Sequence, residues 1–493
     1  MLKSNNKFLI VVALAAFLLV YSYLLLFGPY LLQDADTFWH IRTGQWILDH
    51  ARLPTVDFYS YTESGKPWIS TEWLSEIFYA VAFKLGGWRA VTIVAAASCA
   101  AIVGIVCFYL LRHLRFSVAI GWAVLTAAAI SPHFLARPHI FSYILLTIWM
   151  INLLEAYDDE FSLPPLLTLA PLMILWANLH GSFTLGLALL YIFAGFSVYQ
   201  NFLQRNYTKC WRVLIVTSVV TASALITPYG IAPAFMTVKL LSMKFTREYL
   251  VEWHSPNFQG RYFRLLYLVA ILSAMPGLGI RLRGPRLIAF GLLTVMGLSY
   301  IRGLLMFFLL VPIVLARPAA EGIWYLVPQL SGPKTSESDT TSDPVLRFLQ
   351  KRSFAILASC MALAMLITVR TWWREDIVPL KVIAPTAAID FVQRANITGN
   401  VFNWYGFGGY LIFSGIPTFI DGRAELFGDA FVHKYADAET LADINSAFEM
   451  LDEYNVNWVI FRPQEPLAKA LAQSALWDKV YSDEYSVVFV RRH

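Results

Sequence analysis

Charged residues are scarce in this chain. Only 14% of its 493 residues are charged, whereas 58% are hydrophobic, and the mean hydropathy is +0.56. Soluble domains average about 25% charged and roughly 45–50% apolar residues. The composition therefore excludes an ordinary soluble protein and indicates an integral membrane protein with many spans. The net charge of +5 is small and gives no support to a nucleic-acid partner.

Cysteine pairs and common catalytic motifs are also lacking. Cys99, Cys107 and Cys360 lie in apolar runs, Cys210 follows Lys209, and no CxxC pair occurs. We therefore expect neither disulfides nor a zinc finger. The polar C-terminal region contains no GxGxxG, P-loop, HExxH or GxSxG sequence, so a nucleotide site or a hydrolase site there has no support.

Long apolar windows are abundant. Windows of about 17–25 residues are long enough to cross a bilayer. The first is interpreted as an uncleaved span, because it is too long for a signal peptide and no small-residue cleavage site follows. About eleven transmembrane helices are expected in all, near residues 8–28, 88–111, 116–133, 139–157, 164–179, 183–203, 212–232, 262–280, 286–300, 303–317 and 353–370.

Basic residues near the ends of these windows predict the orientation. With eleven spans, all the basic clusters fall on one side, which we take to be the cytoplasm. The protein is thus expected in the cytoplasmic (inner) membrane, with its N-terminus cytoplasmic and its C-terminus extracytoplasmic. The clusters are Lys3 with Lys7, RHLR at 112–115, RNYTKCWR at 205–212, RLRGPR at 281–286 and KR at 351–352.

The composition changes near Trp372. We divide the chain into a transmembrane domain, residues 1–371, with its first outer loop at 31–87, and an extracytoplasmic α/β domain, residues 372–493. In the second domain, helices are predicted at PTAAIDFVQRA and AETLADINSAFEMLDEY. Strands are predicted at NVFNWY, GYLIF, PTFID and NWVIFRP, and a hairpin at KVYSDEYSVVFVRRH.

The first outer loop begins with residues that can carry chemistry. Asp34, Asp36, His40 and Arg42 fall within nine positions. The segment TFWHIRTGQWILDH predicts a helix on the membrane surface, with Phe38, Trp39, Ile41, Trp46 and Ile47 on its apolar side. The segment STEWLSEIFYAVAFKLGGWRAV predicts an interfacial helix that leads into the second span.

Asp36 has two interpretations. Aspartate is a favoured N-cap residue, so Asp36 could simply cap the helix that follows it. It could instead be a general base that takes the proton from an attacking acceptor hydroxyl. Asp34 would then raise the pKa of one acid or help to hold a divalent cation, Mg or Mn. Arg42 would pin the carboxylate or meet a phosphate.

Other polar residues lie at the expected outer ends of the spans. Arg137 either snorkels to the headgroups or contacts a substrate phosphate, and His180 either breaks a helix or belongs to a site. Arg302 needs an anionic partner if it is buried. The segment EWHSPNF is either a mobile loop over the acceptor or an inert interfacial segment. The candidate substrate-binding residues are Arg42, His40, Arg137, His139, His180, Arg302 and Glu72.

Three segments resemble membrane glycosyltransferases of the GT-C class. Residues 36–42, DTFWHIR, resemble the D-x-x-F-x-x-R opening of oligosaccharyltransferase catalytic subunits. Residues 66–91 resemble a segment of protein mannosyltransferases and of the lipid A aminoarabinose transferase. Residues 401–423 resemble the WWDYG region of oligosaccharyltransferases in position and rhythm, although Trp404, Tyr405 and Gly406 stand where that motif has Trp-Asp-Tyr-Gly.

The resemblance implies transfer of a sugar from a polyprenyl-phosphate or polyprenyl-diphosphate donor to a glycan, lipid or protein acceptor at the outer face. Asp36, with Asp34, would be catalytic. The leaving phosphate would be met by Arg42, Arg137 or Arg302, or by a metal held by the acids. Two alternatives remain: a transporter, which would carry acids near the middle of its spans, and an envelope assembly protein without activity.

Overall fold

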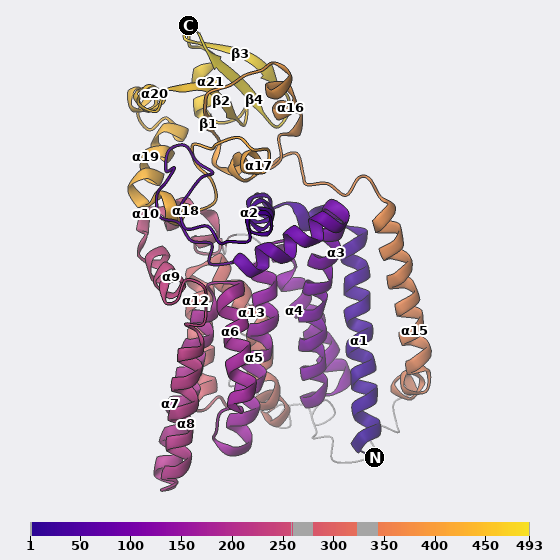
Figure 1. Ribbon diagram of the computed structural model, residues 1–493. Coiled ribbons are helices and arrows are strands. Elements are labelled where there is room, and N and C mark those ends of the chain that lie inside the picture. Colours follow the sequence, from indigo (N-terminus) through magenta and orange to yellow (C-terminus); the bar gives the residue numbers. More distant parts are fainter. Residues whose placement is uncertain (1, 258, 260–279, 323–343, 493) are drawn as a thin grey trace.

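The computed structural model describes residues 2–257, 259, 280–322 and 344–492. Most of these residues form a helical bundle, and a small α/β unit sits at one end of it (Figure 1). The two chain ends lie at opposite ends of the molecule (Figure 1). The bundle helices are α1 (Leu2–Leu26), α3 (Trp73–His113), α4 (Phe116–Ile130), α5 (His139–Glu160), α6 (Leu166–Leu179), α7 (Phe183–Leu203), α8 (Tyr207–Ser223), α12 (Pro285–Ser299), α13 (Ile301–Gly322) and α15 (Pro344–Trp373).

These helices identify a multi-pass membrane protein. Seven described helices are long and apolar enough to cross a membrane, and α6 and α12 are shorter apolar helices. Each predicted window except one coincides with a described helix, although α8 ends at Ser223, earlier than the window at 212–232. The remaining window, 262–280, lies outside the described residues except for Ile280, so the count of eleven is not confirmed.

The helix α3 changes direction at a glycine pair. Gly86 and Gly87 have non-helical backbone angles, and Gly87 has a φ of 59°, which favours glycine. The segment before the pair runs obliquely under the α/β unit, and the segment after it follows the bundle (Figure 1). The predicted helix leading into the second span is thus confirmed.

The helix α2 (Asp36–His50) forms where it was predicted, but its apolar side faces protein. The ring of Phe38 lies 5.1 Å from those of Trp88 and Tyr410 and 5.7 Å from that of Phe413. Tyr410 and Phe413 belong to α17 (Gly408–Phe413), which lies directly above α2 (Figure 1). The expectation that this side rests on lipid is therefore wrong, because the C-terminal unit covers it.

Further short helices connect the two parts. A 3-10 helix, η1 (Gly28–Leu32), precedes α2, and η2 (Ser131–His133) follows α4. The helices α9 (Ala232–Ser242), α10 (Lys244–Tyr249) and η3 (Val251–Trp253) follow one another closely and form a second connecting segment. Asp429 accepts hydrogen bonds from the backbone N–H groups of Phe245 and Thr246, at 3.1 and 2.7 Å. This contact docks the segment on the C-terminal unit.

The C-terminal unit contains one four-stranded sheet in the order β1-β2-β4-β3, with β1 parallel to β2 and the other pairs antiparallel. Its strands are β1 (Asn400–Asn403), β2 (Val456–Phe461), β3 (Trp477–Ser482) and β4 (Val487–Arg491). Its helices are α16 (Thr386–Arg394), α17, α18 (Ala424–Phe427), α19 (Asp429–Thr440), α20 (Ile444–Glu453) and α21 (Pro466–Leu471), with a 3-10 turn, η6 (Tyr405–Phe407), before α17.

Three secondary-structure predictions in this unit are wrong. The segment GYLIF belongs to the helix α17, and Gly408 and Gly409 let this helix approach other backbone closely. A Cβ on Gly409 would lie 2.1 Å from the Ala35 carbonyl oxygen. PTFID adds no strand to the sheet, and its Thr418 forms an isolated bridge with Ser60. The helix predicted at 438–454 is divided at Leu441, which has a φ of 54°.

A buried ion cluster joins the first outer loop to the C-terminal unit. Arg423 pairs with Asp57 at 2.6 Å and with Asp421 at 2.7 Å, and all three side chains are fully buried. The guanidinium also lies over the rings of Trp68 and Tyr59, both in the loop. This part of the loop, which follows α2, is therefore held firmly to the C-terminal unit.

Candidate active site

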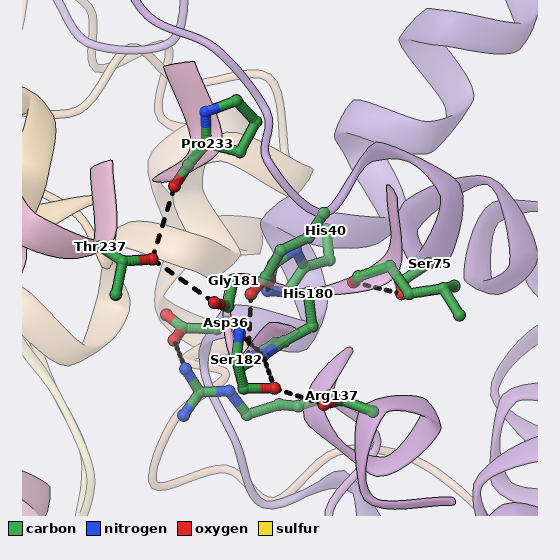
Figure 2. Close-up of polar contacts among 12 residues, drawn as sticks. Asp36, His40, Ser75, Arg137, His180, Gly181, Ser182, Pro233 and Thr237 are labelled. Atoms are coloured by element: carbon green, nitrogen blue, oxygen red, sulfur yellow. Dashed lines mark hydrogen bonds and ion pairs between the residues drawn. The ribbon is translucent and has the colours of Figure 1, made fainter. Parts of the chain in front are cut away.

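Arg137 brings the two acids of the first loop together. The Ala136 N–H donates to the Leu31 carbonyl and the Thr37 hydroxyl donates to the Ala136 carbonyl, both at 2.8 Å. These bonds fix the chain before α5 against the start of α2. The guanidinium then reaches Asp34 at 3.1 Å and Asp36 at 2.5 Å, and Figure 2 shows it pointing at Asp36. Arg137 therefore turns inward instead of snorkelling to the headgroups.

Asp36 is not a helix cap. It is the first residue of α2, Ala35 stands at the N-cap position, and the Asp36 N–H donates to Asp34 Oδ1 at 2.9 Å. The Asp36 carboxylate accepts a hydrogen bond from Trp39 Nε1 at 3.1 Å and faces Arg137. Burial raises the pKa of Asp36 to about 7, with Arg137 opposing the rise and Asp34 adding to it. A carboxylate with such a pKa suits general-base catalysis near neutral pH.

Arg302 is half-buried and has an anionic partner. Its Nε donates to Glu252 at 2.6 Å, its Nη2 contacts the other carboxylate oxygen, and the guanidinium lies over the ring of Trp253. Glu252 also lies 3.6 Å from Arg137. Burial tends to raise the pKa of Glu252, but Arg302 and Arg137 outweigh it and bring this pKa to about 2. Glu252 is therefore ionised and links the two arginines.

A chain of acids and histidines lies next to this cluster. Glu72 contacts His40 Nε2 at 3.4 Å and His180 Nε2 at 3.1 Å, and the other nitrogen of His40 lies 3.2 Å from the buried Glu76. Ser70 donates to the second oxygen of Glu76 at 2.5 Å. Burial raises the pKa of Glu72 to about 8, so this acid is mostly protonated at neutral pH.

The hydrogen bonds of His180 fix its tautomer. The Ser182 backbone N–H donates to His180 Nδ1 at 3.0 Å, so Nδ1 is an acceptor and Nε2 carries the proton toward Glu72. Burial, followed by the charges of Arg302 and Arg137, lowers the pKa of His180 to about 3. His180 stands between α6 and α7 and also lines the cavity described next, so it both ends a helix and belongs to the site.

A cavity of about 470 Å³ opens beside these groups. Its polar lining includes Asp34, Glu72, Arg137, His139, His180, Glu252 and Arg302. Its apolar lining includes Leu185, Pro233, Met236, Leu240, Leu241, Met296 and Met306. The cavity thus joins two guanidinium groups to an apolar wall formed by α9 and the ends of α7, α12 and α13, an arrangement that suits a ligand with an anionic head and an apolar tail.

Arg42 does not lie in this site. Its side chain is exposed, and within the described part of the chain it forms no ion pair with Asp34 or Asp36. The physical reason is helical geometry. Six residues at about 100° each turn the side chain by about 240° beyond a full turn, away from Asp36. The prediction that Arg42 pins the carboxylate is therefore wrong, and Arg137 occupies that position.

The predicted divalent-cation site does not fit this arrangement. Asp34 and Asp36 are both engaged by the Arg137 guanidinium. Across the described residues, no group of three or more His, Cys, Asp or Glu side chains is arranged to hold a metal ion. We therefore derive no step through a metal.

Sequence reasoning missed Glu252 and Glu76 as site residues. Glu252 lies in the segment EWHSPNF, whose two interpretations did not assign the acid itself. The signal that could have found it was Arg302, because an arginine that is partly enclosed at the end of a membrane-helix bundle favours an acid nearby. Glu76 comes one helical turn after Glu72, so its position facing the same histidine follows from the i, i+4 spacing.

Comparisons with known proteins establish the fold. No protein-family model and no curated protein sequence matches this chain. The structure of ArnT from Cupriavidus metallidurans in the apo state matches with a TM-score of 0.50 and 15% identity, covering 96% of both chains. The archaeal oligosaccharyltransferase AglB from Archaeoglobus fulgidus, in complex with an inhibitory peptide and a dolichol-phosphate, matches with a TM-score of 0.53 and 11% identity, covering 92% of this chain and 69% of that chain.

The Archaeoglobus fulgidus oligosaccharyltransferase in complex with Zn and sulfate gives a TM-score of 0.50 at 11% identity, covering 91% of this chain and 68% of that chain. At such identities the likeness establishes the fold alone. This chain shares the fold of ArnT and of the archaeal oligosaccharyltransferase, a polytopic helical bundle with a C-terminal unit, and the fold expected from the resemblance of its three segments is confirmed.

Proposed function

We propose that this protein is a glycosyltransferase that moves a sugar from a polyprenyl-phosphate or polyprenyl-diphosphate donor to an acceptor at the outer face of the membrane. The observation that carries the proposal is the cavity. It joins Arg137 and Arg302 to an apolar wall, which matches the phosphate head and isoprenoid tail of such a donor. The dolichol-phosphate in the AglB structure, a protein of the same fold, supports the same donor class.

The two arginines have the chemistry that the leaving group needs. As the bond between the anomeric carbon and the phosphate oxygen breaks, negative charge grows on the phosphate. Fixed N–H donors aimed at that charge stabilise the transition state. Arginine never loses its proton in proteins and can bind phosphate through two parallel hydrogen bonds, and both arginines line the cavity.

Asp36 is the base in this proposal. The acceptor hydroxyl or amide attacks the anomeric carbon, a new bond to that carbon forms, and the acceptor proton passes to the Asp36 carboxylate. With a pKa of about 7, Asp36 is substantially ionised at neutral pH, whereas Glu72, with a pKa of about 8, mostly keeps its proton and serves as a hydrogen-bond donor. A single in-line displacement of this kind inverts the anomeric centre.

Glu72, His139 and His180 complete the proposal as groups that hold the sugar and the phosphate, with His40 supporting Glu72. Glu72 and His180 line the cavity and share a hydrogen bond. His139 also lines the cavity, and its Nε2 lies 3.1 Å from the His133 carbonyl oxygen, to which it donates. His40 lies behind Glu72 and orients it.

The proposal is tested by donor consumption. Purified protein in liposomes is mixed with polyprenyl-phosphate-linked sugars and a membrane extract that supplies acceptors, and released polyprenyl phosphate is measured by mass spectrometry. Wild type should release it. Arg302→Gln should release much less, while Arg112→Gln, which removes a paired arginine elsewhere in the bundle, should match wild type. Equal release by Arg302→Gln and wild type would exclude the cavity as the donor site.

A further inference from the structure

Three carboxylates converge on the Arg137 guanidinium. Nη1 lies 3.1 Å from Asp34 and 3.6 Å from Glu252, and Nη2 lies 2.5 Å from Asp36. These acids come from two separate parts of the chain, the start of α2 and the 3-10 helix η3. Ionised acids that converge from different elements onto one point repel one another, and a cation placed among them offsets that repulsion.

The positive charge in this cluster equals that of a divalent ion. Arg137 and Arg302 each carry one positive charge, and Glu252 contacts both of them. The Arg137 side chain is only 16% exposed. It enters from the segment before α5, which the bonds of Ala136 to Leu31 and Thr37 hold in place. The cation is thus part of the chain and cannot exchange with solvent.

We propose that Arg137 takes the place of a divalent metal ion in this protein, holding Asp36 in position and presenting N–H donors to the donor phosphate. The inference deepens the proposed function and rests on it for the identity of the phosphate. A guanidinium attracts several carboxylates by its positive charge, as a metal ion does, but it holds them through hydrogen bonds. It has five N–H groups, so it can contact the three acids and still donate to a phosphate oxygen.

Carboxylates freed from Arg137 should become a metal site, because Mg²⁺ and Mn²⁺ bind best to oxygen ligands such as these. We would measure Mn²⁺ binding to the purified full-length protein by electron paramagnetic resonance. Wild type should bind no Mn²⁺ at this place. Arg137→Ala should bind one Mn²⁺ per protein, and Arg137→Ala combined with Asp36→Asn should lose most of that binding.

Two further variants keep the result interpretable. Arg112→Ala removes an arginine from an ion pair elsewhere in the bundle and should create no Mn²⁺ site. Arg137→Gln fills more of the vacated space than Arg137→Ala, so it should stay folded if the smaller side chain does not. Thermal unfolding of each variant shows whether the fold is kept.

Activity gives an independent readout. Wild-type sugar transfer should be unchanged by EDTA, whereas Arg137→Ala should be impaired and partly restored by Mn²⁺. Loss of wild-type transfer in EDTA with recovery on adding Mn²⁺ would overturn the inference, as would an Arg137→Ala protein that is folded and binds no Mn²⁺. If wild type transfers no sugar at all, the proposed function fails, while the Mn²⁺ titration still decides the role of Arg137.

Discussion

Replacing Asp36 with asparagine should lower activity and raise stability at the same time. The amide keeps the size of the side chain and removes the basic oxygen. Losing a general base reduces the rate by roughly 10²-fold or more. In wild type the transfer rate should also fall as the pH drops below about 7, because protonation of Asp36, whose pKa is about 7, removes the base.

The stability effect follows from the same pKa. The folded-state value of about 7 lies above the ordinary value of 3.8, so the folded protein binds this proton more tightly than the unfolded chain. The stabilisation by the protonated acid is complete below pH 3.8 and is lost as the pH rises through 7. Relative to wild type, Asp36→Asn should therefore gain about 1.4 kcal/mol between pH 6 and pH 8, the value of one pKa unit.

The measurement is chemical unfolding of both proteins in detergent at pH 6 and pH 8, together with their transfer rates. Asp49→Asn is the control, since Asp49 lies on the same helix with an exposed side chain. It should change neither the pH dependence of stability nor the rate. If the stability difference between Asp36→Asn and wild type stays constant from pH 6 to pH 8, Asp36 does not titrate there and the argument for it as the base is refuted.

Two further predictions concern the fold. Arg423→Met should destabilise the protein by about 3–5 kcal/mol, because it leaves two fully buried acids without their cation. The control Arg374→Met breaks an exposed pair with Asp376 and should cost at most about 1 kcal/mol. Equal melting temperatures of the two variants would contradict the role of the Arg423 ion cluster in joining the first loop to the C-terminal unit. Sidedness reporters in the turn at 112–115 and after residue 492 should report the cytoplasmic and the outer side respectively, and matching sidedness would refute the predicted orientation.

The bundle was largely predictable because its signal is local. An apolar window reports a membrane helix regardless of what the helix contacts, and the glycine pair at 86–87 marks the bend of α3 within the sequence itself. The C-terminal unit was predictable only in part. The segment GYLIF looks like a strand by composition, yet it is a helix whose Gly409 packs closely against Ala35 of the first loop, a contact between distant segments.

The site could not be predicted from the sequence for the same reason, because its contacts join segments that are distant in the chain. Asp36 was found from its place after the first span, but its partner Arg137 is 101 residues away in the sequence. Neither spacing nor composition links the two. The nearby Arg42 was the natural guess, and helical geometry turns it away. Arg302 signalled that an acid must be close, but only the folded connecting segment shows that this acid is Glu252.

Sugar transfer with Asp36 as the base is tested most directly by incubating a polyprenyl-phosphate-linked sugar and an acceptor with the purified protein. Polyprenyl phosphate released and sugar transferred are quantified together, and the anomeric configuration of the product is read by nuclear magnetic resonance. The account predicts equal amounts of both, an inverted anomeric centre, and a rate lowered roughly 10²-fold or more by Asp36→Asn. Retention of configuration, or transfer by Asp36→Asn at the wild-type rate, would contradict it.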